Sequence, residues 1–186
     1  MTREYGGPVT TQRTAHAADL TRAELRDIRA LLDDAFAGRF SDDDWDHTLG
    51  GVHALVYDST GALVAHGSVV QRRVVHAGRS LRTGYVEGVA VRADARGRGL
   101  GGQVMAELER VIDGAYALGA LSASAAGKAL YEGRGWRQWQ GDFAAYGPEG
   151  TVRLPEDENP PHLRPVTAAL DPAHALLFDW RGGDIL

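Results

Sequence analysis

Residues 84–103, GYVEGVAVRADARGRGLGGQ, pass from a valine-rich run into a loop of arginines and glycines. β-Branched residues such as valine favour a strand. The segment after the loop, VMAELERVIDGAYALG at 104–119, repeats its apolar residues at helical spacing. One carboxylate, Glu87, lies inside the apolar run. The stretch therefore predicts a strand, a glycine-rich loop and a helix in direct succession, with an acid on the strand.

The loop Arg96–Gly102 lies between the predicted strand and the start of the predicted helix, a place where backbone N–H groups can bind phosphate. A helix N-terminus has unpaired N–H groups and the positive end of the helix dipole, so it attracts phosphate. Glycine lets the backbone approach a ligand closely, and arginine adds positive charge. The loop is not a Walker A motif, because no GK[ST] follows. It is not a Rossmann fingerprint either, because no early βαβ unit or downstream acid accompanies it. A glycine-rich turn alone is weak evidence, which the flanking strand and helix strengthen.

The segment before the loop predicts two helices and then three antiparallel strands. Thr21 and Glu24 form a capping-box pattern at the start of a helix that ends near Gly38. Ser41 can cap a second, short helix that ends at Gly50–Gly51. Strands joined by turns at 59–61 and 77–80 are expected at 52–58, 62–75 and 81–92. Residues 1–18 are polar and unpatterned, which predicts a flexible N-terminal extension or a first edge strand.

The segment after the loop predicts one crossover and then further strands. The expected elements are a helix from about Gly99 to Leu118, stopped by Gly119, a strand at 120–124, a short helix ending at Gly135 and strands within 136–180. Residues 154–165, LPEDENPPHLRP, are expected to form a long loop. The order predicts a single α+β domain over residues 1–186, with a mixed central β-sheet flanked by helices.

Composition narrows the class of protein. The chain has 186 residues, 44% of them hydrophobic, which suffices for one core. It has no apolar run of the roughly 18 residues that a membrane span needs, no secretory signal pattern and no cysteine. A cytoplasmic protein without a membrane partner is therefore expected. The net charge of −5 argues weakly against nucleic-acid binding. The seven histidines show no metal-binding spacing, so no metal is expected.

The acidic residues are clustered. They gather at 41–46 (SDDDWD) and 155–158 (PEDE), with Asp179 and Asp184 near the end of the chain. Such clusters are commonly solvated loops. The alternative is a cleft whose field attracts a cationic ligand.

The R-x-x-G-x-G pattern at Arg96–Gly101 resembles the acyl-CoA signature of the GNAT superfamily of N-acetyltransferases. Beyond that pattern, six blocks in order, over essentially the whole chain, are similar to the aminoglycoside 2'-N-acetyltransferases. The blocks are DIRALLDDAFAGRFSDDDWDHTLGGVHALV, AHGSVVQRR, LRTGYVEGVAVRADARG, GAYALGALSAS, LYEGRGW and DWRGGDIL. The resemblance implies a GNAT fold, acetyl-CoA as co-substrate, transfer of the acetyl group to a cationic aminoglycoside and, by analogy, a homodimer.

The resemblance also assigns roles to residues. The coenzyme pantetheine arm would pair with the strand at Val89, Ala90 and Val91, and its pyrophosphate would lie on Arg96, Gly97, Arg98, Gly99, Leu100 and Gly101. Glu87 would be the general base, acting through water, and Tyr131 the general acid. Burial on an apolar strand should raise the pKa of Glu87 toward the working pH. The alternatives are that Glu87 is an exposed strand residue or only a ligand for an ammonium group, and that Tyr131 is an ordinary core residue. Trp136 and Trp139 are expected to pack in the core.

The substrate site implied by the matching blocks is acidic, as a polycation requires. Its candidate residues are Arg39, Asp44, Glu87, Gly88, Ser122, Glu156, Asp157, Asp184 and Leu186 with its terminal carboxylate. The match is least secure at 155–158, where the flanks diverge. Two positions depart from the family: Arg39 stands where an acid is usual, and Leu186 where relatives can carry tryptophan. We expect Arg39 to weaken binding of highly charged 4,6-disubstituted aminoglycosides, so a less cationic 2'-amino sugar such as kasugamycin is the alternative substrate.

Two further functions stay open on the sequence. Another acyl-CoA enzyme of the same fold would acetylate a protein N-terminus, a polyamine or a cell-wall sugar. A binding module would sense acyl-CoA or an antibiotic without turnover, although a sensor need not keep Glu87, Tyr131 and the glycine loop together. For the enzyme, the biological role would be antibiotic resistance or self-protection.

Overall fold

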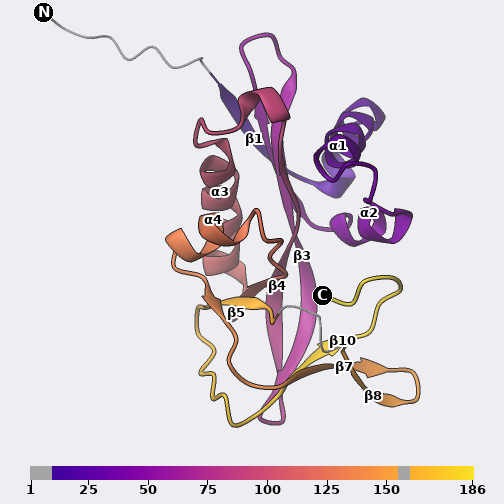
Figure 1. Cartoon of the computed structure of the whole chain (residues 1–186), viewed down its shortest axis with the longest axis vertical. Helices are drawn as coiled ribbons and strands as arrows, with labels where there is room; N and C mark the ends of the chain where they lie inside the picture. The colour runs from indigo at the N-terminus through magenta and orange to yellow at the C-terminus, as the bar shows by residue number, and fades with distance from the viewer. Residues whose placement is uncertain (1–9, 155–159) are drawn as a thin grey trace, which may run out of the picture.

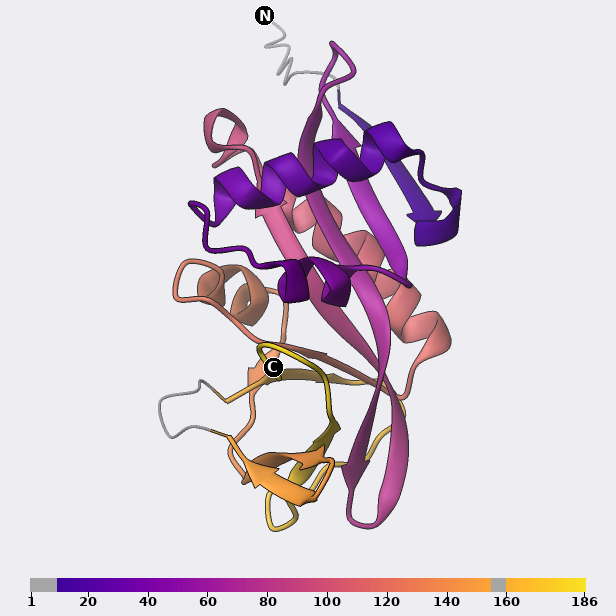
Figure 2. The same ribbon diagram turned by 90° about the vertical axis from the view of Figure 1, so that its right-hand side faces the viewer.

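The structure is a computed structural model that describes residues 10–154 and 160–186 (Figures 1 and 2). Ten strands form one mixed sheet in the order β6-β9-β5-β4-β3-β10-β7-β8, and β1 and β2 extend it beside the first half of β3. Helices α1 and α2 cover one face of this sheet, and α3 and α4 lie on the other (Figure 1). The predicted α+β architecture with a mixed sheet flanked by helices is confirmed.

Both N-terminal helices begin at capping boxes. Helix α1 spans Arg22–Ala35, and Thr21 and Glu24 each accept the other's backbone N–H. Helix α2 spans Asp42–Thr48 and has the same reciprocal pair in Ser41 and Asp44. Both helices are therefore where the sequence predicts them.

The antiparallel meander is also confirmed. Its strands are β2 (Val52–Tyr57), β3 (Leu63–His76) and β4 (Arg79–Val91). Successive side chains of β2 point to opposite faces of the sheet, so they pack against different helices. Leu55 packs with the α1 residues Ile28 and Leu32, whereas Ala54 and Val56 pack with α3. Of the N-terminal segment, Thr11–His16 forms the edge strand β1, antiparallel to β2.

The second half of β3 is bordered by the C-terminal strands. Strand β10 (Leu176–Asp179) pairs antiparallel with the end of β3 and parallel with β7 (Phe143–Gly147), which forms a hairpin with β8 (Gly150–Arg153). This arrangement brings the last residues of the chain to the middle of the sheet (Figure 2).

The crossover from β4 through α3 (Leu100–Ala115) to β5 (Leu118–Leu121) is parallel, as predicted. Two expected boundaries within it are wrong. The helix ends before Leu118, and Gly119 lies inside β5 instead of ending the helix. Packing explains the glycine, because a Cβ at Gly119 would lie 3.0 Å from the Trp136 ring and 3.1 Å from Ile112.

Another correction concerns the expected long loop at 154–165. Its last four residues form strand β9 (His162–Pro165), which pairs with β5 and with the short β6 (Arg137–Gln138). Helix α4 spans Lys128–Gly133, shorter than the sequence predicts. Trp136 and Trp139 are buried, as expected of packing residues.

The splay of β4 from β5 is the feature that positions the site. The two strands pair only at Thr83–Tyr85 against Leu118–Ala120. Within the described ranges, no strand pairs with the remainder of β4 on that side. The backbone from Val86 to Val91 therefore borders an opening in the sheet.

Candidate active site

Two adjoining clefts fill the opening between β4 and β5. The first, of about 370 Å³, lies among α2, β4, the segment after β5 and the C-terminus. The second, of about 540 Å³, runs along β4 toward the glycine loop and α4. They share Phe36, Arg39, Val89, Ser124 and Tyr131. A ligand lying in one cleft can therefore reach a ligand lying in the other.

A β-bulge on β4 shapes the junction of the clefts. Ser68 pairs with Glu87 and His66 with Ala90, so β4 carries one residue more than β3 between these pairs. Gly88 adopts φ +56°, and a Cβ there would lie 2.9 Å from Thr48. Because the bulge interrupts strand alternation, the four successive residues from Val86 to Val89 all border the first cleft.

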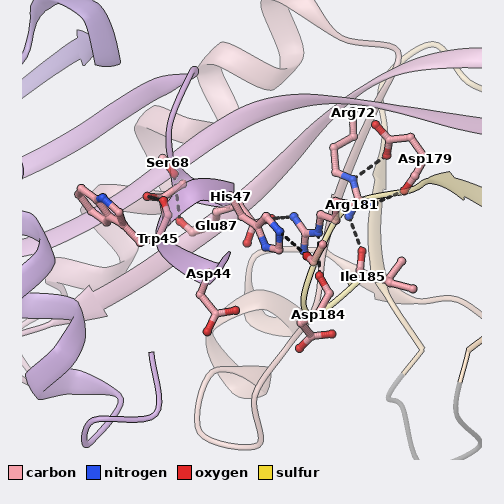
Figure 3. Close-up of polar contacts among 12 residues, drawn as sticks. Asp44, Trp45, His47, Ser68, Arg72, Glu87, Asp179, Arg181, Asp184 and Ile185 are labelled. Atoms are coloured by element: carbon pink, nitrogen blue, oxygen red, sulfur yellow. Dashed lines mark hydrogen bonds and ion pairs between the residues drawn. The ribbon is translucent and has the colours of Figure 1, made fainter. Parts of the chain in front are cut away.

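Glu87 lies in this first cleft, largely buried. Its carboxylate forms an ion pair with Arg181 from the C-terminal segment (Figure 3). Burial raises the pKa of Glu87 above its ordinary value, and the charge and hydrogen bond of Arg181 act in the opposite direction. A raised pKa of Glu87 is also what the sequence predicts. A carboxylate in this environment is a stronger proton acceptor than one in water.

Tyr131 on α4 borders both clefts. Its side chain is largely buried, and burial raises the pKa of its phenol to about 12. The phenol therefore keeps its proton at neutral pH. In the described chain the hydroxyl has no hydrogen-bond partner, although it is not sealed from the cleft. The hydroxyl is thus available to donate to a ligand.

The second cleft gathers part of the predicted coenzyme site. The residues of that site that line the cleft are Val89, Ala90, Val91, Arg96 and Gly101. Gly97 and Gly99 adopt φ of +74° and +79°, a conformation that L side chains rarely adopt. Nothing lies within 4 Å of a Cβ built on either glycine, so no side chain covers the loop there. The loop backbone before α3 fits the approach of a phosphate group.

Two loop side chains point elsewhere. Leu100, the first residue of α3, has its side chain buried in the core, and Arg98 donates to the carbonyl oxygen of Asp94 at 2.9 Å. Both line a separate hollow beside Arg92 and Gln103. Any contribution of Leu100 to the second cleft is therefore through its backbone.

The predicted substrate residues converge on the first cleft. Seven of them line it with side-chain or backbone atoms: Arg39, Asp44, Glu87, Gly88, Ser122, Asp184 and Leu186. Glu156 and Asp157 lie outside the described residues. The Asp44 carboxylate also accepts the backbone N–H of Ser41 at 2.8 Å, which fixes its orientation at the start of α2.

Sequence reasoning missed three residues in or beside the clefts. Arg181 contacts Glu87 directly, Phe36 lines both clefts, and His47 holds the loop that carries Arg181. In the sequence, Arg181 stands out only as part of the block DWRGGDIL, and that pattern alone does not indicate a role for it.

Comparison with known proteins identifies the family. The model of the acetyltransferase (GNAT) domain matches residues 16–139. An aminoglycoside 2'-N-acetyltransferase of Mycolicibacterium fortuitum is 45% identical over 184 residues, which cover 97% of this chain and 94% of that protein. The chain belongs to the aminoglycoside 2'-N-acetyltransferase family of the GNAT acetyltransferases. The resemblance of the six sequence blocks is thereby confirmed.

Solved structures confirm the GNAT fold. The GNAT family N-acetyltransferase YhbS of Escherichia coli, in complex with CoA, superposes with a TM-score of 0.67 at 18% identity and covers 97% of this chain and 94% of its own. An acyl-CoA N-acyltransferase of Pseudomonas aeruginosa gives a TM-score of 0.58 at 21% identity, covering 84% and 99%. At these identities the likeness concerns the fold alone. Together with the family match and the curated relative, this makes the chain an acetyltransferase of GNAT fold.

Proposed function

We propose that this GNAT acetyltransferase moves the acetyl group of acetyl-CoA to the 2'-amino group of an aminoglycoside. The observation that carries the proposal is the convergence of a buried carboxylate, a protonated phenol and several acidic groups on the two joined clefts. The Mycolicibacterium fortuitum relative bears the name of this activity. The role in the cell would be resistance or self-protection.

The coenzyme belongs in the second cleft. Acetyl-CoA, when bound, supplies the acetyl group as an activated thioester. Val89, Ala90 and Val91 offer backbone groups on the open side of β4, where β5 has diverged. Arg96 lines the same cleft, and the loop Arg96–Gly101 offers backbone N–H groups and positive charge to a pyrophosphate. Holding both substrates at one junction supplies much of the rate by itself.

Glu87 and Tyr131 supply the proton transfers. Glu87 accepts, through water, the proton that the attacking ammonium must lose before nitrogen bonds to the acetyl carbon. Tyr131 gives its proton to the sulfur as the carbon–sulfur bond breaks. The nitrogen loses a second proton as the amide forms, and this proton passes to solvent water. Exchange with solvent then removes the proton from Glu87 and returns one to Tyr131. Each transfer needs a pKa near or above the working pH, and burial acts in that direction on both residues.

The acidic wall of the first cleft suits a polyamine sugar. Asp44 and Asp184 line it, and the terminal carboxylate follows Leu186. Arg39 also lines the cleft and opposes these charges. The presence of this cation favours a second candidate, the same transfer to a less cationic 2'-amino sugar such as kasugamycin. Acetylation of another amine by the same chemistry stays a further alternative.

Two properties of the whole protein are part of the proposal. We place the enzyme in the cytoplasm, where acetyl-CoA is available. No helix of the described chain is long and apolar enough to span a membrane. We also propose a homodimer: Tyr146, Val152 and Trp180 expose large apolar surfaces on or beside the C-terminal strands β7, β8 and β10, where a second copy could cover them.

Thiol release from acetyl-CoA tests the activity. Purified protein is assayed with gentamicin, tobramycin, ribostamycin, kasugamycin and amikacin, and Glu87→Gln is assayed beside it. Turnover of several 2'-amino drugs, reduced roughly 100-fold or more in Glu87→Gln, would support the broad substrate proposal. Turnover of kasugamycin alone would support the second candidate. Absence of turnover with all five would overturn the aminoglycoside assignment.

A further inference from the structure

Arg181 is the one side chain in the described chain that forms an ion pair with Glu87, and it comes from the segment after β10. Its Nη1 donates to Oε1 of Glu87, and its Nε donates to the backbone oxygen of Asp184 at 2.9 Å. Its guanidinium lies over the ring of Tyr85, 5.3 Å from the centroid. Three different contacts therefore hold this side chain in one orientation, largely out of solvent.

The loop that carries Arg181 is itself fastened at both ends. Arg72, a buried residue of β3, donates to Asp179 through Nε and Nη2, each at 2.8 Å, and to the backbone oxygen of Ile185 at 2.7 Å. It thus ties residues on both sides of Arg181 to the sheet (Figure 3). At the tip, Nε2 of His47 lies 2.9 Å from the backbone oxygen of Gly182, which joins the loop to α2.

The ion pair uses only one oxygen of the carboxylate. Oε1 of Glu87 accepts from Arg181, whereas no donor of the described residues hydrogen-bonds to Oε2. Oε2 is not sealed from solvent, and Glu87 lines the first cleft. A carboxylate held by one oxygen cannot rotate freely, so the other oxygen keeps a fixed direction.

We propose that Arg181 is a positioning residue for proton transfer, which holds Oε1 of Glu87 so that Oε2 faces the acceptor amine in the cleft. This inference rests on the proposed function of Glu87 as the base. On this account the C-terminal segment is part of the catalytic apparatus, and the bonds from Arg72 and His47 serve to present Arg181.

Other charged and titratable groups surround the pair formed by Glu87 and Arg181. They come from every neighbouring element and are Asp44 and His47 on α2, Arg72 on β3, Tyr85 on β4, Tyr131 on α4, Arg39 after α1, and Asp184 beside Arg181. Among the charges that act on Glu87, Arg181 opposes the effect of burial most strongly. Removing its charge should therefore raise the pKa of Glu87, and this shift reports on the contact in solution.

The test compares Arg181→Met, which has no charge or donor, with Arg181→Lys, which keeps a charge. Protein labelled with ¹³C at the glutamate carboxyls is titrated by NMR, and Glu87→Gln identifies the signal of Glu87. The rate of acetyl transfer is measured against pH in the same variants. Arg110→Met on the exposed side of α3 is the control, since it removes another paired arginine away from both clefts.

We expect the titration midpoint of Glu87 to rise by about one pH unit or more in Arg181→Met and to stay within half a unit of wild type in Arg181→Lys and Arg110→Met. At a pH where Glu87 is ionised in both proteins, kcat should fall at least tenfold in Arg181→Met, with the KM for acetyl-CoA within twofold. Arg181→Lys should recover part of kcat.

Three results would overturn the inference. One is an unchanged Glu87 midpoint in Arg181→Met, which would show that the contact is not kept in solution. Another is full recovery of kcat at high pH, because Arg181 would then tune charge without orienting Oε2. The third is a kcat of Arg181→Met, counted per folded protein, that equals that of wild type. If Arg181→Met does not fold, Arg181→Gln replaces it. Since the NMR titration needs no turnover, failure of the proposed function is seen separately as an inactive wild type.

Discussion

Nδ1 of His66 lies 2.9 Å from the backbone oxygen of Gly88, the residue at the centre of the bulge in β4. A carbonyl only accepts, so Nδ1 carries the proton. Burial lowers the pKa of His66 to about 3, so its ring is neutral and Nε2 accepts. Nε2 in turn lies 2.9 Å from Nδ1 of His53, which therefore donates. Two neutral imidazoles thus fix the direction of the Gly88 carbonyl from beneath the site.

We predict that the donor on residue 66 matters for catalysis. Replacing His66 by leucine removes the donor to Gly88 and should allow the bulge beside Glu87 to change direction. The expected result is a decrease in kcat of roughly tenfold or more, because displacements of about 1 Å at a reacting centre are costly. His66→Gln keeps an N–H donor and should retain more activity. The exposed His174→Leu is the control, and equal activity in all four proteins would contradict the prediction.

The same pair should make the protein sensitive to acid. Burial lowers the pKa of His53 to about 4 and that of His66 to about 3, whereas an unfolded histidine has a pKa of about 6.5. Between these values the unfolded state binds protons that the folded state does not, so stability falls as the pH falls below about 6.5. Each histidine should contribute about 1.4 kcal/mol per pH unit to that loss.

Denaturant unfolding at several pH values measures this loss. The double variant His53→Gln/His66→Gln keeps hydrogen-bonding groups but does not titrate. Its free energy of unfolding should therefore depend less steeply on pH between about 4.5 and 6. Equal slopes in wild type and the double variant would show that the two rings are not buried as neutral groups.

Local features of the fold could be predicted from the sequence, and features that depend on distant packing could not. The capping pairs Thr21/Glu24 and Ser41/Asp44 obey a three-residue rule, and both helices begin as expected. Leu118 fits a helical spacing and a buried strand equally well. What decides between them is the close approach of β5 to Trp136, which no local pattern contains.

The same distinction holds for the candidate site. Glu87, Tyr131 and most residues carried over by the resemblance lie around the two clefts. Arg181 is 94 positions from Glu87 along the chain, and their contact depends on β10 pairing with β3. The contact of His66 with Gly88 depends on the bulge, which shifts the register by one residue. Such pairings follow from topology, which the sequence pattern indicates only in outline.

We predict that the hydroxyl of Tyr131 contributes to the rate and not to folding. Tyr131→Phe keeps the buried ring, so its melting temperature should stay close to that of wild type. Loss of the proton donor to sulfur should lower kcat by about 100-fold, at the lower end of the effect of a general acid. Tyr116→Phe, which removes a hydroxyl at the end of α3, is the matched control. A kcat for Tyr131→Phe within twofold of wild type would remove Tyr131 from the mechanism.

Arg39 should set the preference between substrates of different charge. Arg39→Asp changes the charge of the cleft by two units. We expect kcat/KM to rise for gentamicin by roughly tenfold relative to kasugamycin at low ionic strength, and the gain to shrink as salt screens the cleft. Competition assays with both antibiotics at two salt concentrations measure the ratio. An unchanged ratio would show that Arg39 does not determine the choice of substrate.

The most direct test of the proposed function uses two antibiotics that differ at one group. Kanamycin B carries an amine at the 2' position and kanamycin A a hydroxyl. If the proposed function is correct, wild-type protein and acetyl-CoA convert kanamycin B to a single product, shown by NMR to be acetylated on the 2' nitrogen, and leave kanamycin A unreacted. Acetylation of kanamycin A, or of another nitrogen of kanamycin B, would contradict it.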